Sequence, residues 1–270
     1  MVTLEKHGPW ALITGASAGI GETFARQLAP MGMNLFLTAR RESRLETLKK
    51  ELEEAFQIEV RFLPLDLGES GAVERLDKET ADLDIGLVIN NAGFGAIGLF
   101  LDQDSTRLES MVKLNCVSTM LVAHRFGKRL LKRGRGGMII TASLAAFMAT
   151  PFMGVYGATK AFDLMVGEAM AKELEGTGVD LLVLCPGSTQ TEFGRVAGSA
   201  GGERGGMDVE PVVAAATRSL GRKRVLTTGF ANKATAFLVR FFPRRLTNTL
   251  SAASLGKMVP RGRRRRYDGA

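Results

Sequence analysis

Short apolar runs alternate with longer segments of helical periodicity along most of the chain. The runs, four to seven residues long, fit buried strands. Between them, apolar residues recur every three or four positions, as at Leu45, Leu48 and Leu52, which is the spacing of one helix face. This alternation predicts an α/β fold with a doubly wound, mostly parallel sheet and helices on both of its faces. The predicted strands are residues 11–14, 34–38, 60–63, 86–89, 138–141 and 179–185.

The pattern changes after the last of these strands. Residues 194–206 are rich in glycine, serine and alanine and predict a mobile loop. We divide the chain into a main domain at residues 1–230 and a basic helical extension at residues 231–270. Beyond the loop, the expected elements are a helix over 209–220, a short strand over 224–227 and amphipathic segments near 232–242 and 246–258.

Composition describes an ordinary globular chain. Its 270 residues are 45% hydrophobic and 24% charged, enough for one large domain with a full core. There is no apolar stretch of membrane-spanning length and no signal-peptide pattern at the start, which favours a cytoplasmic protein. Cys116 and Cys185 lie in apolar stretches, and His7 and His124 lack neighbours of metal-ligand type, so we expect reduced thiols and no metal site.

Charge is distributed unevenly. Residues 211–267 contain fourteen Lys or Arg and no Asp or Glu, whereas the remainder has more acidic than basic residues. In the segment near 232–242, Ala234, Phe237, Leu238 and Phe241 recur at helical spacing beside basic residues. This outline fits an interfacial amphipathic helix, and it fits slightly better a helix packed on the substrate side of the main domain or at a subunit contact. The arginine-rich end, residues 261–266, is predicted to be disordered and to meet lipid headgroups or acyl-CoA phosphates; no nucleic-acid-reading motif accompanies it.

A glycine turn lies between the first predicted strand and the helix that follows. Gly15, Gly19 and Gly21 form G-x-x-x-G-x-G, a variant of the usual dinucleotide spacing. Unpaired amide N–H groups and the helix dipole favour a phosphate at such a turn, and glycine lets the backbone approach it. Glycines also serve ordinary tight turns, but the strand-to-helix context supports a pyrophosphate site.

A second constellation suits proton transfer. Tyr156 and Lys160 are one helical turn apart, and Ser143 ends a predicted strand thirteen residues before Tyr156. A phenol with its ordinary pKa near 10 is a poor proton donor at neutral pH, and the Lys160 ammonium is expected to lower that pKa. Tyr156 would be the general acid for carbonyl reduction, and the Ser143 hydroxyl would hold the substrate oxygen.

With these motifs in order, the chain resembles a short-chain dehydrogenase/reductase of the classical type over roughly residues 8–230. The resemblance also rests on residues 90–93 (Asn-Asn-Ala-Gly), on Asn115 and on Pro186-Gly187. It implies a sheet of about seven strands, an Asn115 that holds a proton-relaying water, a substrate lid at residues 188–210 and a homo-oligomer. Phe147, Met148, Phe152 and Met153 would face the pocket mouth. The implied cofactor-binding residues are Gly15, Ser17, Ala18, Gly19, Ile20, Gly21, Arg40, Arg41, Asp66, Leu67, Asn91, Ala92, Gly93, Tyr156, Lys160, Pro186, Gly187, Thr189 and Thr191.

The second predicted strand indicates which dinucleotide is bound. NAD-preferring proteins of this fold carry an acid there, but this strand ends in Arg40 and Arg41 with no acid before Glu42. An arginine can pair with a 2′-phosphate, so NADP(H) is expected, with Arg40 as the first candidate and Arg41 as the second. Ala18 departs from this pattern, because many NADP-using relatives carry a basic residue there. Asp66 resembles the family's adenine contact or serves as a helix N-cap.

The sequence therefore predicts an NADP(H)-dependent oxidoreductase that moves a hydride between nicotinamide and a carbonyl/alcohol pair. Asn115, Ser143, Tyr156 and Lys160 are the expected catalytic residues, and a hydrophobic ketone is the expected substrate. Two alternatives remain: an NAD-dependent enzyme, and a non-enzymatic dinucleotide-binding redox sensor or membrane-associated scaffold.

Overall fold

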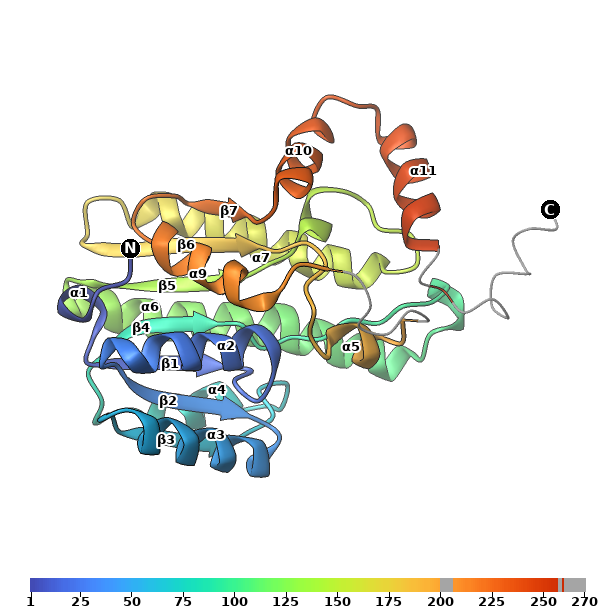
Figure 1. Cartoon of the computed structure of the whole chain (residues 1–270). Helices are drawn as coiled ribbons and strands as arrows, with labels where there is room; N and C mark the ends of the chain where they lie inside the picture. The colour runs from blue at the N-terminus through green and yellow to red at the C-terminus, as the bar shows by residue number, and fades with distance from the viewer. Residues whose placement is uncertain (200–205, 257–258, 260–270) are drawn as a thin grey trace.

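A seven-stranded parallel sheet forms the centre of the computed structural model, which describes residues 1–199, 206–256 and 259 (Figure 1). The strand order is β3-β2-β1-β4-β5-β6-β7, so the order reverses between β1 and β4. The strands are β1 (Trp10–Thr14), β2 (Asn34–Ala39), β3 (Val60–Pro64), β4 (Ile85–Asn90), β5 (Gly136–Thr141), β6 (Val179–Cys185) and β7 (Val225–Thr227). Every predicted strand is confirmed to within two residues at its start and one at its end.

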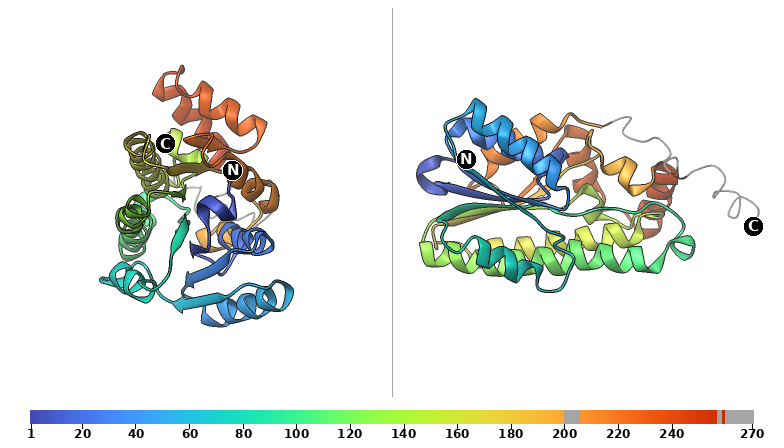
Figure 2. Two further views of the ribbon diagram at one scale, coloured as in Figure 1. Left: turned by 90° about the vertical axis from the view of Figure 1, so that its left-hand side faces the viewer. Right: turned by 90° about the horizontal axis from the view of Figure 1, so that it is seen from below.

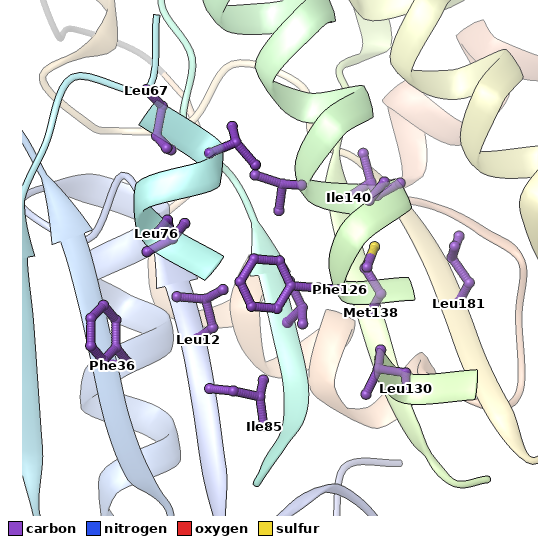
Figure 3. Close-up of a cluster of buried hydrophobic side chains, with 14 of the residues drawn as sticks. Leu12, Phe36, Leu67, Leu76, Ile85, Phe126, Leu130, Met138, Ile140 and Leu181 are labelled. Atoms are coloured by element: carbon purple, nitrogen blue, oxygen red, sulfur yellow. The ribbon is translucent and has the colours of Figure 1, made fainter. Parts of the chain in front are cut away.

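Helices cover both faces of the sheet (Figure 2). One layer contains α2 (Gly19–Leu28), α3 (Glu42–Ala55) and α9 (Val209–Ser219), and the other contains α4 (Ala72–Glu79), α6 (Thr119–Arg133) and α7 (Gly154–Glu173). Alternate residues of each strand feed the two cores: Leu12 packs with the α6 layer and Ile13 with the α2 layer. Phe126 of α6 lies fully buried among Leu12, Ile85 and Met138 (Figure 3).

The remaining elements are short or peripheral. They are α1 (Leu4–His7), η1 (Ala29–Met31), η2 (Phe100–Asp102), α5 (Ser105–Val112), the π-helical η3 (Lys113–Ser118), η4 (Leu144–Phe147), α8 (Phe193–Ala197), α10 (Phe230–Leu238) and α11 (Arg244–Leu255). No helix among the described residues has the length and apolar character to cross a bilayer.

Two sequence expectations need correction in the C-terminal part. Residues 194–197, predicted to lie in a loop, belong to helix α8. The amphipathic segment near 232–242 ends as a helix at Leu238, because the chain turns before Pro243, whose ring excludes a helix interior. The arginine-rich segment 261–266 lies outside the described residues, and the division of the chain at residue 230 stays a prediction.

Helices α10 and α11 form a hairpin at the carboxyl end of the sheet. Helix α10 leads away from the end of β7, the chain turns at Pro243, and α11 returns toward the body (Figure 1). The carboxyl ends of parallel strands on either side of a reversal in strand order form a crevice, so the hairpin stands beside the place where ligands bind in this architecture.

Candidate active site

The glycine turn after β1 is closed too tightly for other residues. Gly15 and Gly19 have φ angles of +68° and +54°, which L-residues rarely adopt. A Cβ on Gly21 would lie 2.3 Å from the carbonyl oxygen of Gly15, so α2 can start against the turn only with glycine at this position. The first residues of α2, Gly19 and Ile20, therefore lie directly beside the cavity at the sheet edge.

The neighbouring turn after β4 is held to β1 by one hydroxyl. Thr14 Oγ1 accepts hydrogen bonds from the backbone N–H groups of Asn91 (2.8 Å) and Ala92 (2.9 Å). The side chain of Asn91 in turn donates to the carbonyl oxygen of Thr14 at 3.1 Å. These contacts fix residues 91–93 directly beside the glycine turn, where a Cβ on Gly15 would lie 3.0 Å from the Ala92 Cα. Thr14 was not among the predicted site residues. Its position at the carboxyl end of a predicted strand is the sequence signal that could have identified it.

Two arginines and an aspartate stand at the end of the crevice near β2 and β3. Arg41 donates to Ser17 Oγ and to the Ser17 carbonyl oxygen, and pairs with Glu192 at 2.7 Å. Arg40 is 63% exposed and lies 3.6 Å from Asp66. Asp66 Oδ1 also accepts from the backbone N–H of Gly68, whereas α4 begins only at Ala72. The helix N-cap alternative for Asp66 is therefore wrong, because its carboxylate closes a turn.

Tyr156 and Ser143 meet on the other side of the cavity. Tyr156 lies in the first turn of α7, is 8% exposed and forms a ring contact with Phe193 of α8, with centroids 5.1 Å apart. Ser143 follows β5 and lies near the Tyr156 phenol, whose pKa it acts to lower. Its Oγ also accepts from the backbone N–H of Ala145 at 3.1 Å, which fixes the hydroxyl at the start of η4. Both hydroxyls line the cavity.

Lys160 is buried one turn further along α7 and is held by two partners. Its Nζ donates to the carbonyl oxygen of Thr141 at 2.8 Å and to Asp163 Oδ2 at 2.9 Å. The Asp163 side chain is fully buried, and its Oδ1 has no hydrogen-bond partner in the structure. Burial disfavours the Lys160 ammonium, but Asp163, Tyr156 and Cys116 together outweigh this effect and raise the Lys160 pKa above its usual value. The lysine side chain is thus a fixed positive charge.

The expected effect of Lys160 on Tyr156 is only partly present. Burial is the largest influence and raises the pKa of Tyr156, while Lys160 and Ser143 act downward. Asp163 acts upward with the burial. The net pKa is raised, so the prediction that Lys160 leaves the phenol with a lowered pKa is wrong, although its own influence has the predicted sign. Sequence reasoning missed Asp163, the carboxylate that offsets the lysine.

Asn115 lies behind this group in the π-helical segment η3. Its amide donates to the carbonyl oxygen of Phe94 at 2.9 Å and to Thr159 Oγ1 at 3.0 Å, and it accepts from the Phe94 N–H at 3.1 Å. These contacts clamp the strand-end loop to α7. A Cβ on Gly93 would lie 3.0 Å from Asn115 Oδ1 and 3.5 Å from Lys160 Nζ, so glycine there brings the three groups together. The water-relay role of Asn115 stays a prediction.

These residues surround one large cavity of about 1190 Å³. It is lined by every predicted site residue except Gly21, which lies under the turn, and Asn115, which lies behind Gly93. Beyond Ser143 and Tyr156 the wall is mostly apolar. That wall is formed by Leu144, Ala145, Met148, Met153, Phe193, Val196, Leu238, Val239, Phe242, Leu250 and Leu255.

Two of the four residues expected at the pocket mouth lie elsewhere. Met148 and Met153 line the cavity as predicted. Phe147 packs instead against the core on the α6 side, and Phe152 packs with the cluster around Met111. Phe152 has a φ of +69°, an unusual conformation for a bulky residue, and this backbone angle belongs to the turn that precedes α7.

The segment after β6 forms the roof of the cavity. Thr191 accepts from the backbone N–H of Phe193, the first residue of α8, at 3.3 Å, while Thr189 donates to the carbonyl oxygen of Gly187. A Cβ on Gly19 would lie 2.9 Å from Thr191 Cγ2, so the roof packs directly on the glycine turn. Arg107 of α5 donates to the Val196 carbonyl oxygen at 2.6 Å and joins the roof to the body.

The residues fit a nicotinamide dinucleotide. Gly15 and Gly21 let the turn close against its protein neighbours without a Cβ clash, and amide groups and the helix dipole at the start of α2 attract a pyrophosphate. Cations stand at the adenosine end of the same cavity and a phenol–hydroxyl pair at the other. One continuous space thus connects the anion-binding turn to the proton-transfer group.

Comparisons with known proteins agree with this geometry. The model of the short chain dehydrogenase family matches residues 9–200. A 7beta-hydroxysteroid dehydrogenase of Collinsella aerofaciens is 33% identical over 235 residues, which cover 85% of this chain and 89% of that protein. A solved structure from work on the stereoselectivity of 7beta-hydroxysteroid dehydrogenase superposes with a TM-score of 0.85 at 30% sequence identity. The match covers 93% of this chain and 100% of that chain. A short-chain dehydrogenase from Sphingobium yanoikuyae in complex with NADPH has a TM-score of 0.77, 31% identity and coverage of 85% and 92%.

The fold and the site define an oxidoreductase of the nicotinamide-dependent Rossmann type, which acts on CH–OH/C=O groups. The chain belongs to the short-chain dehydrogenase family.

Proposed function

We propose that this protein is an NADP(H)-dependent reductase of a hydrophobic ketone. The observation that carries the proposal is a Tyr156–Ser143 pair opening into an apolar cavity that also contains the glycine turn and Arg40. When bound, the nicotinamide supplies the hydride. Tyr156 gives its proton to the developing alkoxide, and Ser143 holds the same oxygen. The phenol is protonated at neutral pH, as a general acid must be, and Lys160 and Ser143 act to lower its pKa and so favour release of the proton.

The cofactor and substrate assignments rest on charge and on the cavity wall. Arg40 and Arg41 offer two cations where a 2′-phosphate would lie, and the absence of an acid before Glu42 favours NADP(H) over NAD. The structure of a relative in complex with NADPH supports this choice. Met148, Phe242 and their apolar neighbours suit a steroid-like or other lipid carbonyl, and the relatives that act on hydroxysteroids support that class.

The proposed setting of the enzyme is the cytoplasm, as a homo-oligomer. Exposed apolar side chains lie on the adjoining segments η3, α6 and α7, and a second copy would bury them. They include Val117, Met120, Leu131 and Met165. Since cells keep NADPH reduced, reduction is the proposed physiological direction.

The test is a panel of hydrophobic ketones mixed with NADPH and either the wild type or Tyr156→Phe. Removing the proton donor should lower kcat by about 10²–10⁴-fold while NADPH affinity stays within about twofold. Nicotinamide absorbance follows turnover, and protein fluorescence follows binding. Retained turnover in Tyr156→Phe would refute the role of the phenol. NADPH binding without turnover of any ketone would favour the non-enzymatic redox sensor or scaffold.

A further inference from the structure

The turn of the α10–α11 hairpin is an unbroken exposed stretch of aromatic and basic side chains. Residues 240–246 are all exposed, and Phe237 and Phe241 are 60% and 69% exposed, with their rings 5.1 Å apart. We call this surface the hairpin tip; it comprises Phe237, Arg240, Phe241, Phe242, Pro243, Arg244, Arg245 and Leu246. Isolated exposed apolar residues are normal, but five within the ten residues 237–246, at a projecting turn, form a patch large enough to suggest a binding partner.

Charge restricts what that partner can be. Residues 230–256 contain Lys233, Arg240, Arg244 and Arg245 and no acidic residue. None of these four cations forms an ion pair with any residue that the structure describes. A second copy meeting this surface through a two-fold axis would place arginines against arginines with no acid to offset them. The end of the chain, residues 261–266, is itself cationic and is repelled for the same reason.

We propose that the hairpin tip is a docking surface for an anionic lipid bilayer. Phe237, Phe241 and Leu246 would enter the interfacial region of the bilayer, and Arg240, Arg244 and Arg245 would meet the headgroup phosphates. Aromatic rings beside arginines suit this boundary, where one end of the surface is apolar and the other is charged. The Pro243 turn allows a short projection to insert without exposing unpaired backbone from a long loop.

The cavity lies beside the docking surface, so membrane binding could deliver a hydrophobic substrate to it. This step rests on the proposed function. Leu238, Phe242 and Leu250 are exposed and also line the cavity that contains Tyr156. The same hairpin therefore forms the tip and the apolar rim of the cavity. A hydrophobic ketone dissolved in the bilayer would reach the cavity along this rim without crossing water.

Vesicle sedimentation tests the docking surface without any need for activity. The full-length protein is mixed with phosphatidylcholine vesicles, either pure or with phosphatidylglycerol added. The wild type should bind the anionic vesicles and bind the neutral ones weakly. Phe241→Ser should weaken binding about tenfold, and Arg244→Glu with Arg245→Glu should weaken it more than tenfold at low salt.

Two matched controls lie at the opposite, amino-terminal end of the strands. Leu4→Ser removes an exposed apolar side chain from α1, and Arg222→Glu with Lys223→Glu makes the same charge change within the basic quarter. Both should bind like the wild type. Absence of wild-type binding would overturn the proposal, as would equal binding by Phe241→Ser. If the wild type does not bind vesicles but Phe241→Ser changes the molar mass of the protein in solution, the surface binds another protein chain. That result would also overturn the lipid proposal.

The substrate route is tested separately. For a water-soluble ketone, Phe241→Ser should leave kcat/KM within about twofold, whereas turnover of a ketone held in anionic vesicles should fall with binding, about tenfold. If neither ketone is turned over by the wild type, the proposed function fails while the vesicle result still decides the docking surface. Equal turnover of the vesicle-held ketone by both proteins would overturn the route.

Discussion

The sheet with its two helix layers and the α10–α11 hairpin differ in what holds them in place. Helix α2 buries five of its ten residues, whereas α11 buries one of twelve and α10 one of nine. Burial of apolar surface is the main source of stability, so the body is fixed by its own packing and the hairpin largely is not. Apolar residues that contribute little to the fold of their own chain indicate an interaction with something outside it.

Charge follows the same division. In the body, many cations are paired with acids, among them Arg41 with Glu192, Arg125 with Glu74, and Lys160 with Asp163. In the hairpin, four cations have no acidic partner among the described residues. A protein surface balanced by its own acids needs no ligand, whereas an unbalanced cationic surface attracts anions. The difference between the two regions is therefore one of packing and of electrostatics together.

The sharpest test of the comparison sets two phenylalanines against each other. Phe126→Ala should lower the free energy of unfolding by about 3–5 kcal/mol, because Phe126 is fully buried in the core of Figure 3. Phe241→Ala should change it by less than about 0.5 kcal/mol, because its ring is mostly exposed. Urea unfolding of both variants measures the two values. A loss above about 2 kcal/mol for Phe241→Ala would mean that the hairpin is part of the cooperative core.

Acid should act on the body and leave the hairpin unchanged. His7 is fully buried, and burial lowers its pKa to about 4, with Asp180 opposing and Lys6 assisting the shift. The folded state therefore favours neutral His7, and this stabilisation is present above the unfolded pKa near 6.5 and is lost as pH falls toward 4. The loss amounts to at most about 3 kcal/mol. Residues 230–256 contain no Asp, Glu or His, so nothing in the hairpin titrates in this range.

Urea unfolding at several pH values measures this loss, and His7→Gln provides the control. The variant should be less stable at neutral pH, since the site is packed around an imidazole, but its stability should fall less steeply as the pH drops. Parallel curves for the wild type and His7→Gln would show that His7 does not carry the acid sensitivity.

The sequence predicted the strands and the glycine turn far better than the packing around the site, for reasons visible in particular residues. The strands around Leu12 and Val183 are buried on both faces, so their apolar runs are unambiguous, and the glycine turn is dictated by contacts of Gly21 within a few residues. Predicting the details of the site required knowledge of contacts between elements that are distant in the sequence. The partnership of Asp163 with Lys160 and the placement of Phe147 in the core depend on how α7 and η4 pack, which periodicity does not encode.

Buried and exposed charges should also differ in their effect on the reaction. Asp163→Asn removes a buried negative charge beside Lys160 and Tyr156, so release of a proton from this pair becomes easier. The alkaline limb of the pH profile for reduction should move to lower pH by about one unit. At a fixed alkaline pH on that limb, the activity should therefore fall about tenfold. Arg244→Gln, which removes an exposed hairpin charge, should leave the limb in place. An unmoved limb in Asp163→Asn would mean that the carboxylate has only a packing role.

The smallest expected effect compares two exposed arginines, Arg40 of the body and Arg240 of the hairpin. Arg41 is already engaged by Ser17 and Glu192, whereas Arg40 lies 3.6 Å from Asp66, and exposed pairs of this kind contribute only about 0–1 kcal/mol. Arg40 can therefore exchange its partner for a 2′-phosphate at little cost.

Arg40→Asp should weaken NADPH binding by about five- to tenfold and leave NADH affinity equal or slightly higher, while Arg240→Asp should alter neither. Fluorescence titration with both dinucleotides measures the ratio. A fall in NADPH affinity only in Arg41→Asp would transfer the phosphate contact to Arg41, and a wild type that prefers NADH would refute the NADP(H) assignment. If Arg240→Asp weakens NADPH binding as much as Arg40→Asp does, Arg40 makes no specific contact with the 2′-phosphate. Both arginines would then act only through the overall positive charge of the chain.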